Sequence, residues 1–124
     1  MGLILVDTSV WIDHIKHPIA ELSRMLDAGS SVLHPFVLAE IALGNLADWQ
    51  RRVDGLRRLP AAEPVSGEIL LAAISDLGLQ GSGLGFVDAH LLAWAVAAPD
   101  RRLWSRDRRL REQAEAAGIA WRPD

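Results

Sequence analysis

Four acidic side chains stand where a carboxylate could do chemistry: Asp7, Glu40, Asp88 and Asp107. Asp7 comes directly after the apolar run Leu3–Val6, which is typical of a strand buried on both faces. In an open parallel sheet, ligands gather beyond the carboxyl ends of the strands, so a functional acid is expected there. The alternative is that Asp7 caps the helix that follows, which is a common role for aspartate.

Glu40 is the acid that is hardest to explain by structure alone. On a helix it shares a face with Val37, Ile41 and Gly44. A charge buried on such a face is costly unless it is paired or holds a metal, so the pattern favours a functional role. The alternative is that Glu40 lies at the edge of the apolar stripe and reaches solvent.

Asp88 and Asp107 also sit at the starts of predicted helices. Asp88 lies in the first turn of the most apolar helix, 86–97, where most of the surface must be buried. Asp107 follows a predicted strand at 102–105. Each has a simple structural alternative, because acids are favoured near helix N-termini and often cap them.

The combination of the four acids indicates a metal site. Carboxylates gathered at one edge of a sheet repel one another, and two in close contact cannot both stay ionised without compensation. Lys16 is the only lysine of the chain, and no arginine lies near the first three acids in the sequence. A divalent cation is the natural compensator, and an all-oxygen ligand set favours Mg²⁺ or Mn²⁺. Such sites typically serve phosphoryl chemistry.

The elements that must position these acids alternate along the chain. Short apolar runs predict strands, and segments with helical spacing or capping signals predict helices between them. The strands are expected at 3–6, 31–33, 102–105 and 119–121, and the helices at about 10–12, 18–28, 35–43, 48–58, 66–77, 86–97 and 107–117. This order predicts an α/β fold, with a short central parallel sheet covered by helices on both faces.

Length and composition set the broad class of the protein. The chain has 124 residues, half of them hydrophobic, and shows no repeat or linker, so residues 1–124 are expected to form a single domain. It has no cysteine, which excludes disulfides and thiolate metal sites. The first residues do not form a signal peptide or a membrane span, and a cytoplasmic protein is expected.

The arginines are unevenly distributed. The net charge is −3, yet basic residues cluster at 51–58 and 101–111. Phosphate binding follows local patches rather than the total charge. Arg106, Arg108 and Arg109 flank Asp107 and could bind RNA phosphates beside the acids. The alternative is that they are ordinary solvated helix arginines.

Four motifs, in order and with matching spacing, resemble the PIN-domain nucleases, and among them the VapC toxins of toxin–antitoxin pairs. The resemblance covers nearly the whole chain. Its residues are the opening Leu-Val-Asp7-Thr8-Ser9-Val-Trp-Ile, Glu40, Gly85-Phe86-Val87-Asp88-Ala89-His90-Leu91 and Leu103-Trp104-Ser105-Arg106-Asp107.

The resemblance implies a role for each acid. Asp7 and Asp88 are similar to the family's direct metal ligands, and Glu40 to the acid that holds the ion or its waters. Asp107 resembles the outer acid that orients water or a second ion. Ser9, or alternatively Thr8, resembles the hydroxyl that supports the first aspartate.

The same resemblance implies a PIN-like fold and a function. The implied activity is magnesium-dependent endonucleolytic cleavage of RNA, carried out by the toxin of a type II toxin–antitoxin pair. The implied partners are a VapB-type antitoxin, which blocks the metal site, and a second copy of the chain in a homodimer. His90 is outside the four-acid pattern and is left unassigned.

The same residues do not fit the patterns of other metal-dependent or phosphate-binding proteins. A dehalogenase-like phosphatase needs a second acid where Ser9 stands, and a receiver domain needs paired acids and a late lysine that the chain lacks. The glycine loop 81–85 lacks the Walker lysine, and no histidine spacing fits zinc. The remaining alternative is a catalytically silent PIN-like binding module in which the acids serve only as caps.

Overall fold

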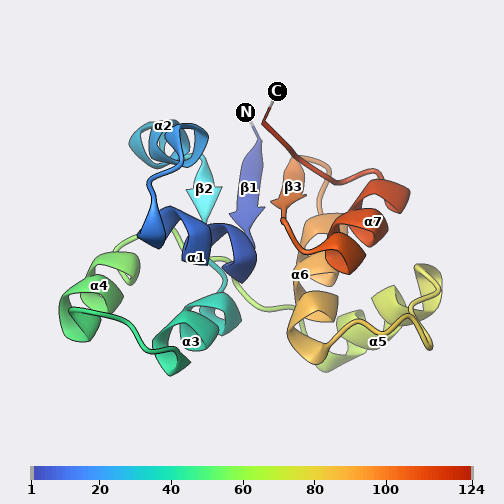
Figure 1. The fold of residues 1–124 in the computed structure, drawn as a ribbon. Coiled ribbons are helices and arrows are strands. Elements are labelled where there is room, and N and C mark those ends of the chain that lie inside the picture. The colour runs from blue at the N-terminus through green and yellow to red at the C-terminus, as the bar shows by residue number, and fades with distance from the viewer. Residues whose placement is uncertain (1, 124) are drawn as a thin grey trace.

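The computed structural model describes residues 2–123 and is built around a parallel sheet of three strands in the order β2–β1–β3 (Figure 1). The strands are β1 (Leu3–Val6), β2 (Ser31–Val32) and β3 (Arg101–Trp104). In the central strand, Leu5 is in register with Val32 on one side and Leu103 on the other. All three strands therefore end at the same edge of the sheet.

Helices connect and cover the strands, and most of them begin where the sequence signals predict. Gly29 ends the second helix in a left-handed conformation, Pro35 opens the third, and Ser66 caps the fifth through the backbone N–H of Ile69. The helices are α1 (Thr8–Lys16), α2 (Ala20–Ala28), α3 (Pro35–Leu43), α4 (Trp49–Leu56), α5 (Gly67–Asp76), α6 (Phe86–Val96) and α7 (Arg108–Ala116).

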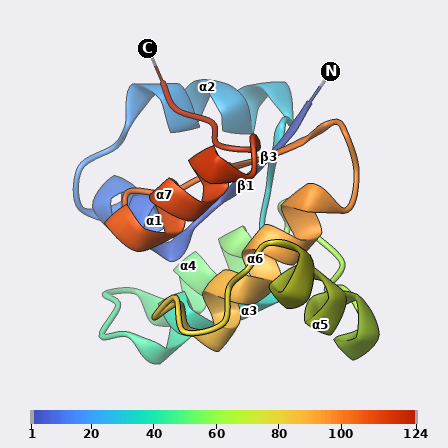
Figure 2. The same cartoon turned by 90° about the vertical axis from the view of Figure 1, so that its right-hand side faces the viewer.

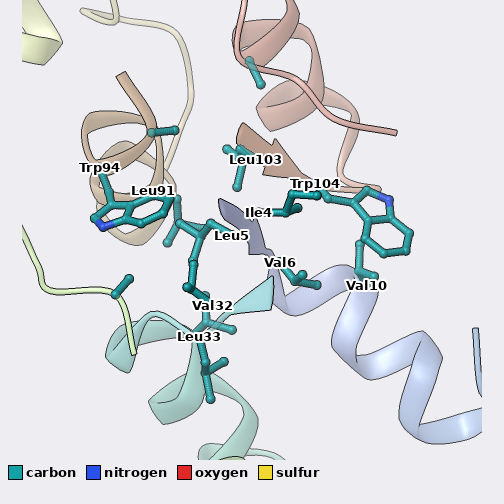
Figure 3. Close-up of a cluster of buried hydrophobic side chains, with 14 of the residues drawn as sticks. Ile4, Leu5, Val6, Val10, Val32, Leu33, Leu91, Trp94, Leu103 and Trp104 are labelled. Atoms are coloured by element: carbon teal, nitrogen blue, oxygen red, sulfur yellow. The ribbon is translucent and has the colours of Figure 1, made fainter. Parts of the chain in front are cut away.

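The helices lie on both faces of the sheet, as the sequence predicts. Figure 2 shows α1, α2 and α7 on one side and α5 and α6 on the other. Figure 3 shows how β1 serves both layers, because alternate side chains of a strand point to opposite faces. Val6 points toward Val10 of α1, whereas Leu5 points toward Leu91 of α6 (Figure 3). Leu5, Val6, Val10 and Leu91 are fully buried.

The segment at the C-terminal end is the place where the strand prediction fails. The expected strand at 119–121 is a single parallel bridge between Leu103 and Ala120. Its backbone bonds are Leu103 N–H to Ile119 C=O at 2.8 Å and Trp121 N–H to Leu103 C=O at 2.9 Å. Pro123 follows and has no N–H to donate, so the pairing cannot extend.

Strand β3 begins one residue earlier than predicted and ends one residue earlier. Its last ladder bond runs from the Asp7 N–H to the Trp104 C=O at 2.9 Å, which leaves Ser105 beyond the sheet. Among residues 2–123, no helix is both long enough and apolar enough to cross a membrane. That residues 1–124 form one domain, and that the protein is cytoplasmic, stay predictions.

Candidate functional site

The four acids predicted from the sequence come together at the carboxyl edge of the sheet. Asp7 follows β1, Asp107 lies just beyond β3, and Glu40 and Asp88 are carried by α3 and α6. The pKa of Asp88 is raised from 3.8 to about 6, first by burial and then by the negative charges of Asp7, Asp107 and Glu40. The negative charges of all three other acids therefore act on Asp88, and the four acids form one electrostatic cluster.

Asp7 is a buried member of the cluster, and several hydrogen bonds hold its carboxylate. It is 4% exposed, and three donors hold its carboxylate. Oδ1 accepts a hydrogen bond from the Thr8 N–H at 2.7 Å, and Oδ2 accepts from the hydroxyls of Ser9 at 2.8 Å and Ser105 at 2.7 Å. An ionised carboxylate has about four acceptor positions, so three donors leave about one for a further ligand.

Ser9 and Ser105 join the two loops that carry Asp7 and Asp107. Each hydroxyl donates to Asp7 and also accepts a backbone N–H from the loop after β3: Arg106 to Ser9 and Asp107 to Ser105, both at 3.0 Å. Ser105 is buried, although it lies outside the sheet. The sequence predicts Ser9 or Thr8 as the supporting hydroxyl and misses Ser105, which it places at the end of the predicted strand 102–105, in the motif around Asp107.

Glu40 is exposed, so the expectation that it is buried on an apolar face was wrong. Its neighbours Val37 and Ile41 face the core, and Glu40 lies at the edge of their stripe. Its carboxylate nevertheless belongs to the site, because Oε1 accepts a hydrogen bond from the Thr8 hydroxyl at 2.7 Å. Thr8 therefore supports Glu40 with its side chain and Asp7 with its backbone.

Asp107 is both the cap of a helix and a member of the cluster. It is the N-cap residue of α7, where its Oδ1 accepts the Leu110 N–H at 3.0 Å. Its side chain is otherwise exposed, and its charge contributes to the raised pKa of Asp88. The capping interpretation of Asp107 is thus correct, and it does not remove Asp107 from the site.

The cluster carries negative charge that the described residues do not neutralise. None of the four acids forms an ion pair with arginine or lysine within residues 2–123. In the same part of the chain, no three histidine, aspartate or glutamate side chains are placed so that they could hold a metal ion as they stand. The donor set and the uncompensated charge suit a hard divalent cation, but gathering three ligands requires side chains to move. The exposed Glu40 has room to do so.

The three arginines beside Asp107 are already engaged. Arg106 pairs with Asp13 at 2.8 Å, Arg108 pairs with Glu112 at 2.9 Å, and Arg109 donates to the Gly83 C=O at 3.3 Å. These contacts are on the surface and are worth little energetically, so a phosphate can replace them. A surface cavity of about 590 Å³ is lined by Asp107 and two of the arginines, together with Ser82 and Glu112.

His90 lies behind the site rather than in it. It is 6% exposed and its ring packs edge-on against Phe36 and Phe86. The neighbouring His34 is fully buried, and its Nδ1 accepts the Phe36 N–H at 3.1 Å. Burial, with a smaller contribution from His90, lowers the pKa of His34 to about 4. Both histidines are therefore part of the aromatic packing behind the site.

The chain was compared with known proteins. The PIN domain family matches residues 4–116. The chain is 37% identical over 118 residues to "Ribonuclease VapC32" of Mycobacterium tuberculosis, from strain CDC 1551 / Oshkosh and from strain ATCC 25618 / H37Rv, and the match covers 95% of each chain. Its fold is similar to the crystal structure of PAE2754 from Pyrobaculum aerophilum, with a TM-score of 0.69 and 17% identity, covering 97% of this chain and 88% of that one.

Proposed function

This chain belongs to the PIN-domain family, and from that premise we propose that it is a VapC-type toxin that cleaves RNA endonucleolytically with the help of Mg²⁺. The observation that supports this most strongly is the effect of three separate acids on the pKa of Asp88. The four carboxylates come from four separate segments and lie near one another at the edge of the sheet where ligands bind in open parallel folds. Capping accounts for the positions of Asp7 and Asp107, but not for that of Glu40, which lies in the middle of α3.

In the proposed site, Asp7 and Asp88 are direct metal ligands, Glu40 holds the ion or its waters, and Asp107 is the outer acid. When bound, Mg²⁺ or Mn²⁺ would neutralise charge on the phosphate oxygens and make a water easier to deprotonate. The chain's own contribution is positioning. The hydroxyls of Ser9 and Ser105 fix the orientation of the Asp7 carboxylate.

Hydrolysis has simple requirements in this arrangement. A water oxygen bonds to phosphorus while the bond from phosphorus to the leaving ribose oxygen breaks. The water must lose a proton, and the leaving oxygen must gain one. Asp107 is the candidate acceptor of the water proton. Its side chain is exposed, and the Leu110 N–H engages only Oδ1, which leaves the other oxygen for the proton. Arg106, Arg108 and Arg109 are candidates for holding the flanking phosphates.

The proposed partners follow from the family. A VapB-type antitoxin is expected to bind the toxin and block the site, and the toxin is expected to act as a homodimer. The gene next to this one is expected to encode that antitoxin, and co-expression of the two chains tests whether they purify as one complex.

Asp7→Asn is the variant that tests the proposed reaction. Asparagine keeps the shape and can still cap α1, but it removes one negative charge. The purified full chain should cut unstructured RNA with Mg²⁺ or Mn²⁺ and stop cutting when EDTA is added. Asp7→Asn should lower the rate by about 100-fold or more. Asp27→Asn, which changes an exposed acid on α2, is the matched control and should cut at the normal rate.

The competing function is a silent PIN-like binding module. It predicts no thermal stabilisation by Mg²⁺ or Mn²⁺, and equal behaviour of Asp7→Asn and the unmodified chain. Metal-dependent stabilisation that Asp7→Asn loses favours the nuclease. Equal cleavage by both proteins, with or without metal, would overturn the metal-site proposal.

A further inference from the structure

We propose that Phe86, stacked against Phe36, is a platform for one unpaired base of the RNA substrate, next to the four-acid cluster. The inference rests on the proposed ribonuclease function and deepens it. It names the residues that would hold one unpaired base of that RNA.

The platform is an exposed aromatic ring that another ring supports. Phe86 is the first residue of α6 and is 67% exposed. Its ring is stacked with that of Phe36 on α3, with centroids 6.2 Å apart and planes 26° apart. Stacked aromatic pairs offer a flat apolar face, and an exposed ring of this size has a hydration cost that a ligand can relieve.

His90 holds both rings in place from the buried side. Its imidazole meets Phe36 edge-on at 4.9 Å and 86°, and meets Phe86 at 4.7 Å and 71°. His34, whose ring lies 6.2 Å from that of His90, also packs against Phe36 at 4.8 Å. The two phenylalanine rings are therefore ordered before any ligand arrives. A ligand that stacks on a preorganised ring loses less entropy than one that must order it.

The platform is continuous with the proposed reaction site. Phe36 lies one helical turn before Glu40 on the same face of α3. Phe86 lies two residues before Asp88 in the first turn of α6, so these two side chains point to different sides of that helix, and the platform is linked to the acids through Phe36. The loop before Phe86 contains exposed glycines at 81, 83 and 85, which put no side chain in the way of a nucleotide. The cavity lined by Asp107, Arg108 and Arg109 lies at the α7 side of the same cluster.

This arrangement favours an RNA strand over a double helix. An RNA passing over the acids would have phosphates beside the arginines of α7 and a base over Phe86. In duplex RNA, neighbouring bases cover each base face, so no face is free to stack on a protein ring. Unpaired bases can stack on aromatic side chains in any sequence, because every base has a π-face.

The test is a double-mutant cycle in which the Phe86 ring and one RNA base are removed separately and together. Binding is measured in the Asp7→Asn background, so that no cleavage occurs, with single-stranded RNAs that carry one abasic nucleotide at successive positions. With Phe86 present, an abasic nucleotide at one of these positions should weaken RNA binding by about 5-fold to 150-fold, which is the usual range for loss of one stacked base. With Phe86→Ala added, the intact RNA should bind that much more weakly and the abasic penalty should vanish. Phe86→Trp should restore both.

Control variants and substrates separate stacking from a folding defect. Leu71→Ala removes a side chain on α5 that is 64% exposed and should leave the abasic penalty unchanged. A hairpin stem of the same sequence should bind equally weakly whether the protein keeps Phe86 or carries Phe86→Ala. A penalty that is the same in both proteins, or absent at every position, overturns the platform.

Failure of the base-stacking proposal can be distinguished from failure of the proposed ribonuclease function. If the unmodified chain cuts RNA in a metal-dependent way and Phe86→Ala cuts and binds the same RNA equally well, the nuclease stands and the platform is wrong. If Phe86→Ala instead changes only the oligomeric mass in solution, the rings serve contact between two copies, and the base-stacking proposal is again overturned. If the unmodified chain neither binds nor cuts RNA, both proposals fail.

Discussion

Asp88→Asn is expected to stabilise the metal-free protein while destroying its proposed activity. Burial and three neighbouring acids make the ionised form of Asp88 unfavourable in the folded chain. Asparagine has nearly the same shape and no charge, so it removes this repulsion. The same substitution removes a proposed metal ligand. Stability and function should therefore move in opposite directions.

The size of the effect follows from the pKa of Asp88. A folded-state pKa of about 6 against an ordinary value of 3.8 corresponds to about 3 kcal/mol when the group is ionised in both states. Asp88 is only half-buried, and solvent screening reduces this to about 1–2 kcal/mol. Because the folded pKa is raised, the stabilising effect of the bound proton is fully present below 3.8 and is lost as pH rises to about 6.

The assay is denaturant unfolding in EDTA at pH 4 and pH 8, which lie about two pH units below and above the Asp88 pKa of about 6. At pH 8, Asp88→Asn should have the larger free energy of unfolding, and at pH 4 the difference should nearly disappear. Asp27→Asn should show no such pH-dependent gain. Adding Mg²⁺ at pH 8 should stabilise the unmodified chain and leave Asp88→Asn unchanged.

One result would refute this reasoning. If Asp88→Asn is less stable than the unmodified chain in EDTA at pH 8, the Asp88 carboxylate is already compensated within the protein. The four acids would then be a network of caps and hydrogen bonds rather than a site that lacks a cation.

Three further predictions rest on single contacts. Ser105→Ala removes one of the two hydroxyls on Asp7 and should lower the free energy of unfolding by about 1–3 kcal/mol, and Mg²⁺ titration should show weaker binding. Gly83→Ala places a Cβ 2.6 Å from Arg109 Nη1 at a φ of +84°, so calorimetry should show a loss of about 1–2 kcal/mol that adding Arg109→Ala only partly reverses. Replacing Arg108 and Arg109 together by alanine should reduce the slope of log K against log salt for single-stranded RNA by about 0.7 per lost phosphate contact, and an unchanged slope would remove them from the RNA site.

The fold could be predicted from the sequence because its signals are local. The apolar run of β1 ends sharply at a charge, and Gly29, Pro35 and Ser66 mark helix boundaries that the structure keeps. The predicted strand at 119–121 failed because Pro123 has no N–H with which the pairing to Leu103 could continue. An apolar triplet alone does not show how many backbone hydrogen bonds the segment will form with a neighbouring strand.

The site was predicted less completely, because its details depend on side-chain reach. Ser105 was missed, since only the pairing of β1 with β3 brings it to Asp7. The burial of Glu40 was predicted wrongly, because a helical face has an edge that spacing alone does not define. Glu40 joins the cluster through Thr8, a contact between residues 32 apart in the chain.

The opposition between capping and function, which the sequence leaves open for Asp7 and Asp107, is not a real opposition in this fold. Asp7 accepts the Thr8 N–H at the start of α1, and Asp107 accepts the Leu110 N–H at the start of α7. A helix that follows a parallel strand begins at the carboxyl edge of the sheet, which is also where ligands bind. The cap position and the ligand position therefore coincide, and one aspartate can fill both. It follows that substitution by alanine would remove cap and charge together, whereas Asp107→Asn keeps the cap and tests the charge alone. Asp7→Asn also keeps the cap, but it replaces the oxygen that accepts from Ser9 and Ser105.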